Sequence, residues 1–226
     1  MKVLCTAKHR FIGFLIPAML LLGTFVSVHT LSHTLTGKVI VVDAGHGGID
    51  PGANRSGVLE KDINLAIALD LKDILNQYGC KVILSRQADV DLSGECDNEK
   101  VRGRYHRDLA ARVEIVEESD ADLFISIHAN AVANDAKRHG AEVFYYSKSD
   151  SGKTLANSIQ GELCKVTEAN RTAKNADYFV LRRNKIPAAL IEVGYITNME
   201  ERMALQTPEY QKKLAEAIAV GIHKYY

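Results

Sequence analysis

Several residue types are scarce in this chain, and each shortage excludes a class of protein. The 226 residues contain no tryptophan, four cysteines and four prolines, and 28 basic and 28 acidic side chains leave no net charge. Nucleic-acid-binding domains carry a basic excess, so no nucleic acid is expected as a partner. The ordinary hydrophobic content of 46% excludes collagen-like and disordered chains. The length suits one domain with a sizeable core.

Cysteine usage indicates neither a disulfide framework nor a thiolate metal site. Cys5 precedes a long apolar run, and Cys80, Cys96 and Cys164 follow it without any C-x-x-C spacing. Three is an odd number, so at most one bridge can form among the later cysteines, and the sequence does not choose it.

The first 35 residues differ from the rest of the chain. They hold three basic residues and no acidic one, and the basic stretch precedes an uncharged apolar run from Phe11 to Val28. This order is typical of an export signal, and the basic flank is expected to stay in the cytoplasm. We therefore expect residues 1–35 to be a signal peptide or an N-terminal membrane anchor. The anchor is favoured because no clear cleavage site follows; a buried core helix is the other alternative.

Residues 36–226 are accordingly expected outside the cytoplasm, and there strand-like and helix-like segments alternate. Apolar and β-branched runs predict strands at 38–43, 80–84, 122–128, 141–146, 178–181 and 188–193. Apolar residues at helical spacing predict helices at 60–78, 108–118 and 151–169, and a last one through Leu214, Ile218 and Ile222. Residues 87–107 show no periodicity and are expected to form a long surface excursion. The alternation indicates an α/β sheet with helices on both faces.

Polar residues stand at the ends of the predicted strands, where sites collect in sheets of this kind. His46 follows the first strand in a glycine-rich loop, His128 ends the third, and Glu60 begins the first long helix. Two histidines and one glutamate form the ligand set of a catalytic zinc that keeps one position for water. Glu192 ends another apolar run and is the candidate general base.

Each of these residues also has an ordinary structural interpretation. His46 could be a turn residue, His128 a strand-end histidine bonded to backbone, and Glu60 a partner of the helix dipole. Glu192 is harder to explain in this way, because an unpaired carboxylate in an apolar run is costly to bury. Joint occurrence favours a metal site, although the chain carries no local zinc signature of the H-E-x-x-H kind.

Four segments carry these residues: VDAGHGGIDPGA at 42–53, LEKD at 59–62, FISIHANA at 124–131 and LIEVGYITN at 190–198. In this order they resemble the signatures of the zinc-dependent N-acetylmuramoyl-L-alanine amidases, catalytic domain type 3. The resemblance covers nearly all of residues 38–226. It implies that His46, Glu60 and His128 hold zinc and that Glu192 is catalytic. It also implies a phosphorylase/hydrolase-like three-layer fold with a mixed, mostly parallel six-stranded sheet.

The activity implied by this resemblance is hydrolysis of one amide in peptidoglycan. Zinc-activated water would cleave between the lactyl group of N-acetylmuramic acid and the L-alanine of the stem peptide, with Glu192 accepting the proton. Asn130, Arg182 and Arg183 are expected to contact stem-peptide carboxylates or glycan, a solvated strand end being the alternative for them. The family usually has Phe at the position of Tyr195, a departure that removes no ligand.

A catalytic domain behind a signal or anchor, without wall-binding modules, is also similar to the spore-cortex amidases of germination. Their cut permits muramic-δ-lactam formation, so a functional link to a muramic-acid deacetylase and an accessory lipoprotein partner are expected. Two other classes stay open. One is a zinc carboxypeptidase-like exopeptidase, and the other is a non-catalytic peptidoglycan-binding module, which would need no carboxylate beside its metal.

Overall fold

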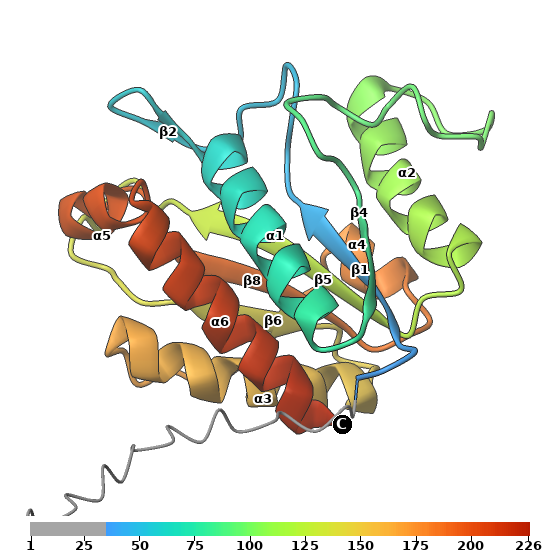
Figure 1. Ribbon diagram of the computed structural model, residues 1–226. Coiled ribbons are helices and arrows are strands. Elements are labelled where there is room, and N and C mark those ends of the chain that lie inside the picture. The colour runs from blue at the N-terminus through green and yellow to red at the C-terminus, as the bar shows by residue number, and fades with distance from the viewer. Residues whose placement is uncertain (1–34) are drawn as a thin grey trace, which may run out of the picture. The chain divides into compact units, whose positions relative to one another are not determined.

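A six-stranded sheet runs through the part of the chain that the structure describes, residues 35–226 (Figure 1). In this computed structural model the strand order is β4-β1-β5-β8-β6-β7. The parallel strands are β4 (Lys81–Leu84), β1 (Val39–Ala44), β5 (Leu123–Asn130) and β8 (Ala188–Tyr195). β6 (Glu142–Tyr145) is antiparallel to β8, and β7 (Lys174–Asn175) is parallel to β6. The expected mixed, mostly parallel six-stranded sheet is confirmed.

Helices cover both faces of the sheet. The helices are α1 (Glu60–Gln77), α2 (Arg104–Glu118), α3 (Asp150–Thr167), α4 (Phe179–Arg183), α5 (Met199–Ala204) and α6 (Pro208–Tyr225). One core cluster joins the sheet to α1, α3 and α6, and a second joins its other face to α2 and α4. In Figure 1, α1 and α6 lie side by side in front of the strands. A small hairpin of β2 (Asn54–Arg55) and β3 (Val58–Leu59) precedes α1.

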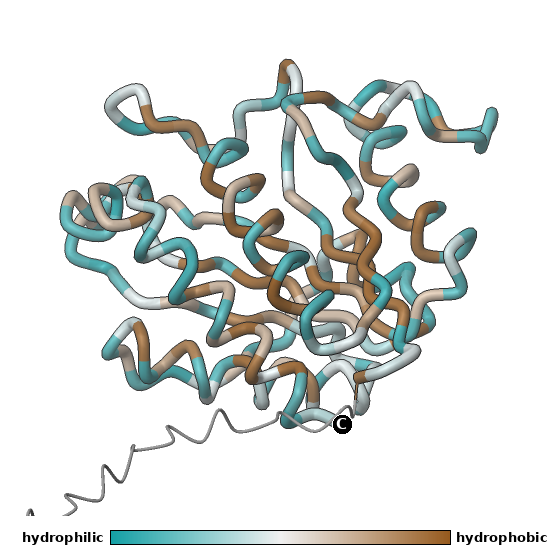
Figure 2. The backbone as a smooth tube through the Cα atoms, viewed as in Figure 1, coloured by the Kyte–Doolittle hydropathy of each residue, from teal (hydrophilic) through white to brown (hydrophobic). Residues whose placement is uncertain are grey.

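Side chains alternate between the two faces along each strand, so the strands contribute apolar residues to both core clusters. In β8, Ile191 and Val193 pack on the side of α1, α3 and α6, whereas Ala188 and Leu190 pack with Leu181 of α4. Strands buried on both faces have continuous apolar sequences, which is why these runs were recognisable. Figure 2 shows hydrophobic residues concentrated in the central strands, whereas the helices and loops around them are of mixed hydropathy.

The face covered by α2 and α4 becomes polar at one edge of the sheet. The alternation that buries Leu190 places Glu192 on this face, and the strand register sets it beside His128 of β5 and Glu142 of β6. Asp43 of β1 and its register partner Ser126 of β5 lie on the same face. The fold thus collects five polar side chains on one face of the sheet.

The predicted strand at 178–181 is wrong, because this segment begins α4. Backbone N–H groups of Leu181 and Arg182 donate to the carbonyl oxygen of Tyr178, which closes a helical turn. The turn buries Val180 and Leu181 in the α2/α4 core. The sixth strand is instead β7, four residues earlier. A short apolar run fits a strand or one helical turn equally well, so periodicity could not decide.

Other differences are smaller. Helix α2 begins at Arg104 rather than 108, and α5 was not predicted. The excursion before α2 is tied down by Arg107, which donates to the carbonyl oxygens of Ser93 and Cys96. The three cysteines in the described residues are free thiols. The predicted signal or anchor, residues 1–35, falls outside the described part except for Leu35, which is buried in the core. No helix within residues 35–226 is long and apolar enough to cross a membrane.

Contact between α3 and α6 gives a stability test with a built-in control. A Cβ at Gly221 of α6 would lie 2.5 Å from the Ile159 Cα of α3, whereas a Cβ at Gly161 would meet nothing within 4 Å. We expect Gly221→Ala to lower the free energy of unfolding by about 1–3 kcal/mol through overpacking. Gly161→Ala should raise it by about 0.5–1 kcal/mol, since alanine is the better helix former.

Thermal unfolding of the purified protein measures both changes, at about 2–4 °C per kcal/mol for a chain of this size. Similar shifts of the two variants in the same direction would contradict the close approach of α3 and α6.

Candidate metal centre

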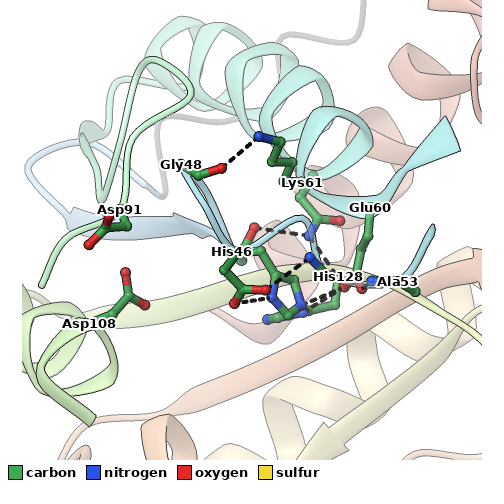
Figure 3. Close-up of polar contacts among 12 residues, drawn as sticks. His46, Gly48, Ala53, Glu60, Lys61, Asp91, Asp108 and His128 are labelled. Carbon is green, nitrogen blue, oxygen red and sulfur yellow. Dashed lines mark hydrogen bonds and ion pairs between the residues drawn. The ribbon is translucent and has the colours of Figure 1, made fainter. Parts of the chain in front are cut away.

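Three side chains from separate elements point at one another beside the polar edge of the sheet (Figure 3). His46 comes from the loop after β1, Glu60 is the first residue of α1, and His128 lies in β5. One ligand atom of each lies within 4.8 Å of the other two. The Glu60 Oε1 atom is 3.1 Å from the His46 Nε2 and 2.9 Å from the His128 Nδ1. The structure therefore brings together the three residues that the sequence proposed as ligands.

Glycines make this close approach sterically feasible. His46 itself has a φ of 61°, a left-handed conformation that non-glycine residues adopt rarely and mostly at functional sites. A Cβ at Gly45 would overlap the His128 ring, and a Cβ at Gly52 would lie 2.6 Å from the Glu60 Oε2. The glycine-rich stretch is needed because the two imidazoles and the carboxylate fill the space beside its backbone.

Two buried arginines fix the backbone of the His46 loop. Arg86 Nε donates to the Ala44 carbonyl oxygen at 2.9 Å, and its Nη2 donates to the Gly45 oxygen at 3.0 Å. Arg112 Nη2 donates to the His46 carbonyl oxygen at 2.9 Å. Three successive carbonyl groups are thus held by guanidinium groups, so the loop cannot turn without breaking charged hydrogen bonds.

Arg112 is held in place by two carboxylates. Its guanidinium pairs with Asp43 at the end of β1 and, at 2.8 Å, with Asp108 one turn earlier in α2. Ser126 Oγ donates to the other oxygen of Asp43 at 2.6 Å. Burial alone would raise the pKa of Asp43, but Arg112 and Ser126 outweigh it and lower the pKa below its ordinary value. Asp43 therefore stays charged and keeps Arg112 beneath the loop.

A further set of contacts orients the two histidines and the glutamate. Asp50 Oδ2 lies 2.8 Å from the His46 Nδ1, which leaves Nε2 directed at Glu60. The backbone N–H groups of Ala53 and Ala129 donate to the two oxygens of Glu60. A carboxylate behind a histidine is the usual support of a metal ligand, because it fixes the tautomer and the ring orientation.

The charges of this cluster are strongly coupled. Burial opposes the charged imidazole of His46, but hydrogen bonds and charges of Glu60 and Asp50 raise its pKa to about 9. Burial likewise opposes the charged form of Glu60, and the two histidines outweigh it and lower its pKa well below the ordinary range. A protonated His46 neutralises Glu60 here, a role that a divalent cation can take over.

The donor set fits zinc. Two imidazole nitrogens and one carboxylate oxygen converge, with Asp50 behind His46, and this is the composition of catalytic sites that keep a position for water. Within the described residues no cysteine belongs to the group. The composition of the donor set therefore agrees with the expected cofactor.

Glu192 lies next to this cluster in β8 and lines the same cavity, which has a volume of about 530 Å³. Its Oε2 atom is buried and has no hydrogen-bond partner among the described residues. Burial raises the pKa of Glu192; the His128 charge opposes this and the Glu60 charge reinforces it, giving a value of about 7. A carboxyl poised near neutrality beside a metal cluster is suited to proton transfer.

Of the three predicted substrate contacts, one lines the cavity and two lie outside its lining. Asn130 lines the cavity and follows His128 in β5. Arg182 and Arg183 end α4 outside the cavity lining, with Arg182 paired to Asp177 at 2.7 Å and both guanidinium groups over the Phe179 ring. Sequence reasoning did not identify two exposed aromatic residues that line the cavity, Tyr105 and Tyr178.

Comparisons with known proteins agree with this site. Residues 40–224 match the family described as N-acetylmuramoyl-L-alanine amidase. The chain is 39% identical to the germination-specific N-acetylmuramoyl-L-alanine amidase of Bacillus subtilis, over 97% of this chain and 95% of that protein. The chain belongs to the N-acetylmuramoyl-L-alanine amidase family.

Solved structures give the same result. The CwlD amidase from Clostridioides difficile, in complex with the GerS lipoprotein, matches with a TM-score of 0.78 and 43% identity, over 83% of this chain and 98% of that chain. The amidase AmiC2 of Nostoc punctiforme matches with a TM-score of 0.71 and 40% identity, over 84% and 98%. The protein is an amidase of peptidoglycan, and family membership decides against the exopeptidase and the pure binding module.

Zinc affinity is expected to depend on pH through His46. With its pKa raised to about 9, the imidazole carries a proton at neutral pH in the metal-free protein, and this proton must leave before a metal binds. Below that pKa, each unit rise in pH should therefore strengthen apparent zinc binding about tenfold. Competition titrations with a zinc-sensitive dye between pH 6 and 8 measure the slope.

Asp50→Asn is the matched comparison for this titration. It removes one of the two carboxylates that raise the His46 pKa, so its affinity should level off at a lower pH than that of the wild type. A wild-type affinity that stays constant between pH 6 and 8 would show that His46 is not a ligand or is already neutral.

Proposed function

We propose that His46, Glu60 and His128 hold a catalytic zinc ion and that Glu192 transfers the proton in amide hydrolysis. One observation carries this proposal: the three donors converge beside a buried carboxylate oxygen that has no other partner in the described residues. Zinc supplies Lewis acidity, which lowers the pKa of water toward about 7 and polarises an amide carbonyl.

Glu192 then performs both proton steps. Its Oε2 accepts a proton from the attacking water, and the same carboxyl returns it to the leaving amino group of L-alanine. A pKa of about 7 suits both directions, since the group is neither a weak base nor a weak acid at neutral pH. Asp50, Arg86 and Arg112 act through His46 by holding its ring and backbone, and they need not touch the substrate.

The cavity beside Glu192 is the proposed seat of the muramoyl peptide. Asn130 lines it and is proposed as a substrate contact, and the flat rings of Tyr105 and Tyr178 offer surfaces for sugar or peptide. Arg182 and Arg183 lie at the end of α4, outside the cavity lining, so a contact with them is proposed only for a substrate that extends beyond the cavity.

The biological setting belongs to the same proposal. Residues 36–226 would form the catalytic domain, and residues 1–35 would export it or anchor it at the membrane, which places it in the cell-wall or spore-cortex space. Support comes from the similarity to a germination-specific amidase and to an amidase whose structure contains a lipoprotein. The proposal therefore includes a role in cortex maturation, in which the cut permits muramic-δ-lactam formation. It also includes an accessory lipoprotein as a partner and a deacetylase that acts on the same glycan.

Glu192→Gln separates catalysis from metal binding. The variant should retain zinc, because Glu192 is not one of the three converging donors, and its turnover should fall by about 10²–10⁴-fold. His46→Ala and His128→Ala should lose both zinc and turnover. Metal analysis paired with mass spectrometry of muropeptide products measures the two properties, and release of peptides that begin with L-alanine identifies the amidase cut.

Glu200→Gln replaces an exposed residue of α5 and is the control for the preparation of variant proteins. It should change neither zinc content nor turnover. Undiminished turnover of zinc-loaded Glu192→Gln would rule out the assigned proton transfer. Release of single C-terminal residues instead of whole stem peptides would favour an exopeptidase.

A further inference from the structure

A second charged cluster lies directly beside Glu192 on the same face of the sheet. Glu142 of β6 is the register partner of Glu192, and side chains of directly opposed residues in an antiparallel pair point to the same face. The row of partners His128, Glu192 and Glu142 therefore crosses three adjacent strands. Glu142 lies on the opposite side of Glu192 from the metal cluster.

Three cations converge on this one carboxylate. Lys174 Nζ lies 2.8 Å and Arg138 Nη2 3.1 Å from the Glu142 Oε1, and the Arg171 guanidinium pairs with the same oxygen. The Tyr195 hydroxyl donates to the other oxygen at 2.8 Å. Burial would raise the pKa of Glu142, but these donors outweigh it and lower the pKa to about 2. Glu142 is thus charged whenever the enzyme works.

Three cations share one carboxylate at this cluster. The neighbouring carboxylates are Glu192, the register partner of Glu142, and Glu201, whose two oxygens accept the backbone N–H groups of Gly140 and Tyr195. An ion pair that only held β6 in place would need a single cation, so the two additional cations call for another explanation.

The three cations differ in the other contacts that they make with the protein. Arg171 also donates twice to the His139 carbonyl oxygen, which fixes it as a structural tie. In the described residues the ammonium of Lys174 has Glu142 as its single ion-pair partner and its side chain is 47% exposed. Arg138 pairs with Glu142, its guanidinium carbon lies 5.2 Å from the centre of the Tyr195 ring, and its side chain is 36% exposed. Both Lys174 and Arg138 are therefore partly exposed beside β6, the strand next to Glu192.

The spacing matches a peptide bound through the cavity. Two strand separations lie between His128 and Glu142, about 10 Å, and an extended peptide advances about 3.3 Å per residue. A carboxylate two or three residues from the cleaved amide would reach the cluster. Tyr178 connects the cavity with β6, because it lines the cavity and its ring packs edge-on against Phe144 of β6.

We propose that Arg138 and Lys174, positioned by Glu142, bind a free carboxylate of the stem peptide and so select the substrate of this amidase. The proposal rests on the proposed function, since it takes Glu192 as the point of cleavage. It assigns recognition of the peptide to the β6–β7 edge of the sheet rather than to the arginines of α4. Arg171 and Tyr195 hold Glu142 so that its charge sets the positions of the two binding cations.

The test compares two substrates on the full-length, zinc-loaded enzyme. One is a muramoyl tripeptide with free stem carboxylates, and the other is the same compound with these carboxylates converted to carboxamides. Lys174→Gln and Arg138→Gln should each raise KM for the free acid about tenfold, the usual worth of one charged hydrogen bond, with kcat unchanged. KM for the carboxamide should change little. Lys174→Arg should behave as wild type with both substrates.

Lys185→Gln is the matched control, because Lys185 is 88% exposed and pairs with Glu117, at 3.7 Å, rather than with Glu142. It should leave both KM values unchanged. Equal losses on both substrates, or no loss on either, in Lys174→Gln and Arg138→Gln would overturn the proposed subsite while wild-type turnover upholds the amidase centre. Failure of the wild type to cleave either compound would overturn the subsite and the proposed catalytic centre together.

Discussion

Two buried guanidinium groups, on Arg86 and Arg112, hold the carbonyl oxygens of residues 44–46, and the rest of the site depends on this constraint. They keep the backbone of His46 in a left-handed conformation that brings its ring beside Glu60 and His128. Removing one partner of a buried ion pair such as Arg112–Asp43 generally costs about 3–5 kcal/mol, because the other charge stays buried. The loop is therefore rigid, and this rigidity keeps the His46 ring beside Glu60 and His128.

The three register partners His128, Glu192 and Glu142 lie in three different environments. His128 shares the Glu60 carboxylate with His46, Glu192 has one buried oxygen without a partner among the described residues, and Glu142 is paired with three cations. The consequences are opposite for the two glutamates: the pKa of Glu192 is about 7, and that of Glu142 is about 2. Two identical side chains on neighbouring strands can thus serve proton transfer and charge positioning.

Much of the fold could be predicted from the sequence because its information is local. Strands buried on both faces form continuous apolar runs, and the glycines around His46 indicated a loop after the first strand, whereas its close approach to Glu60 and His128 was seen only in the structure. The turn of α4 could not be distinguished from a strand, since four apolar residues fit either structure and tertiary packing decides. The roles of Arg86 and Arg112 in the His46 loop could not be predicted either, because the carbonyl groups of residues 44–46 that they hold lie 41 to 68 residues away. The sequence around Glu142 predicted a strand, but it did not predict that three cations pair with this glutamate.

The claim tested most directly is that His46, Glu60 and His128 form one zinc site. X-ray absorption at the zinc edge, on protein loaded with one equivalent of zinc, reports the ligand atoms. The account predicts two imidazole nitrogens and one carboxylate oxygen from the protein, and loss of one imidazole signal in His128→Ala at saturating zinc. A sulfur ligand, an all-oxygen shell or an unchanged spectrum in that variant would contradict it.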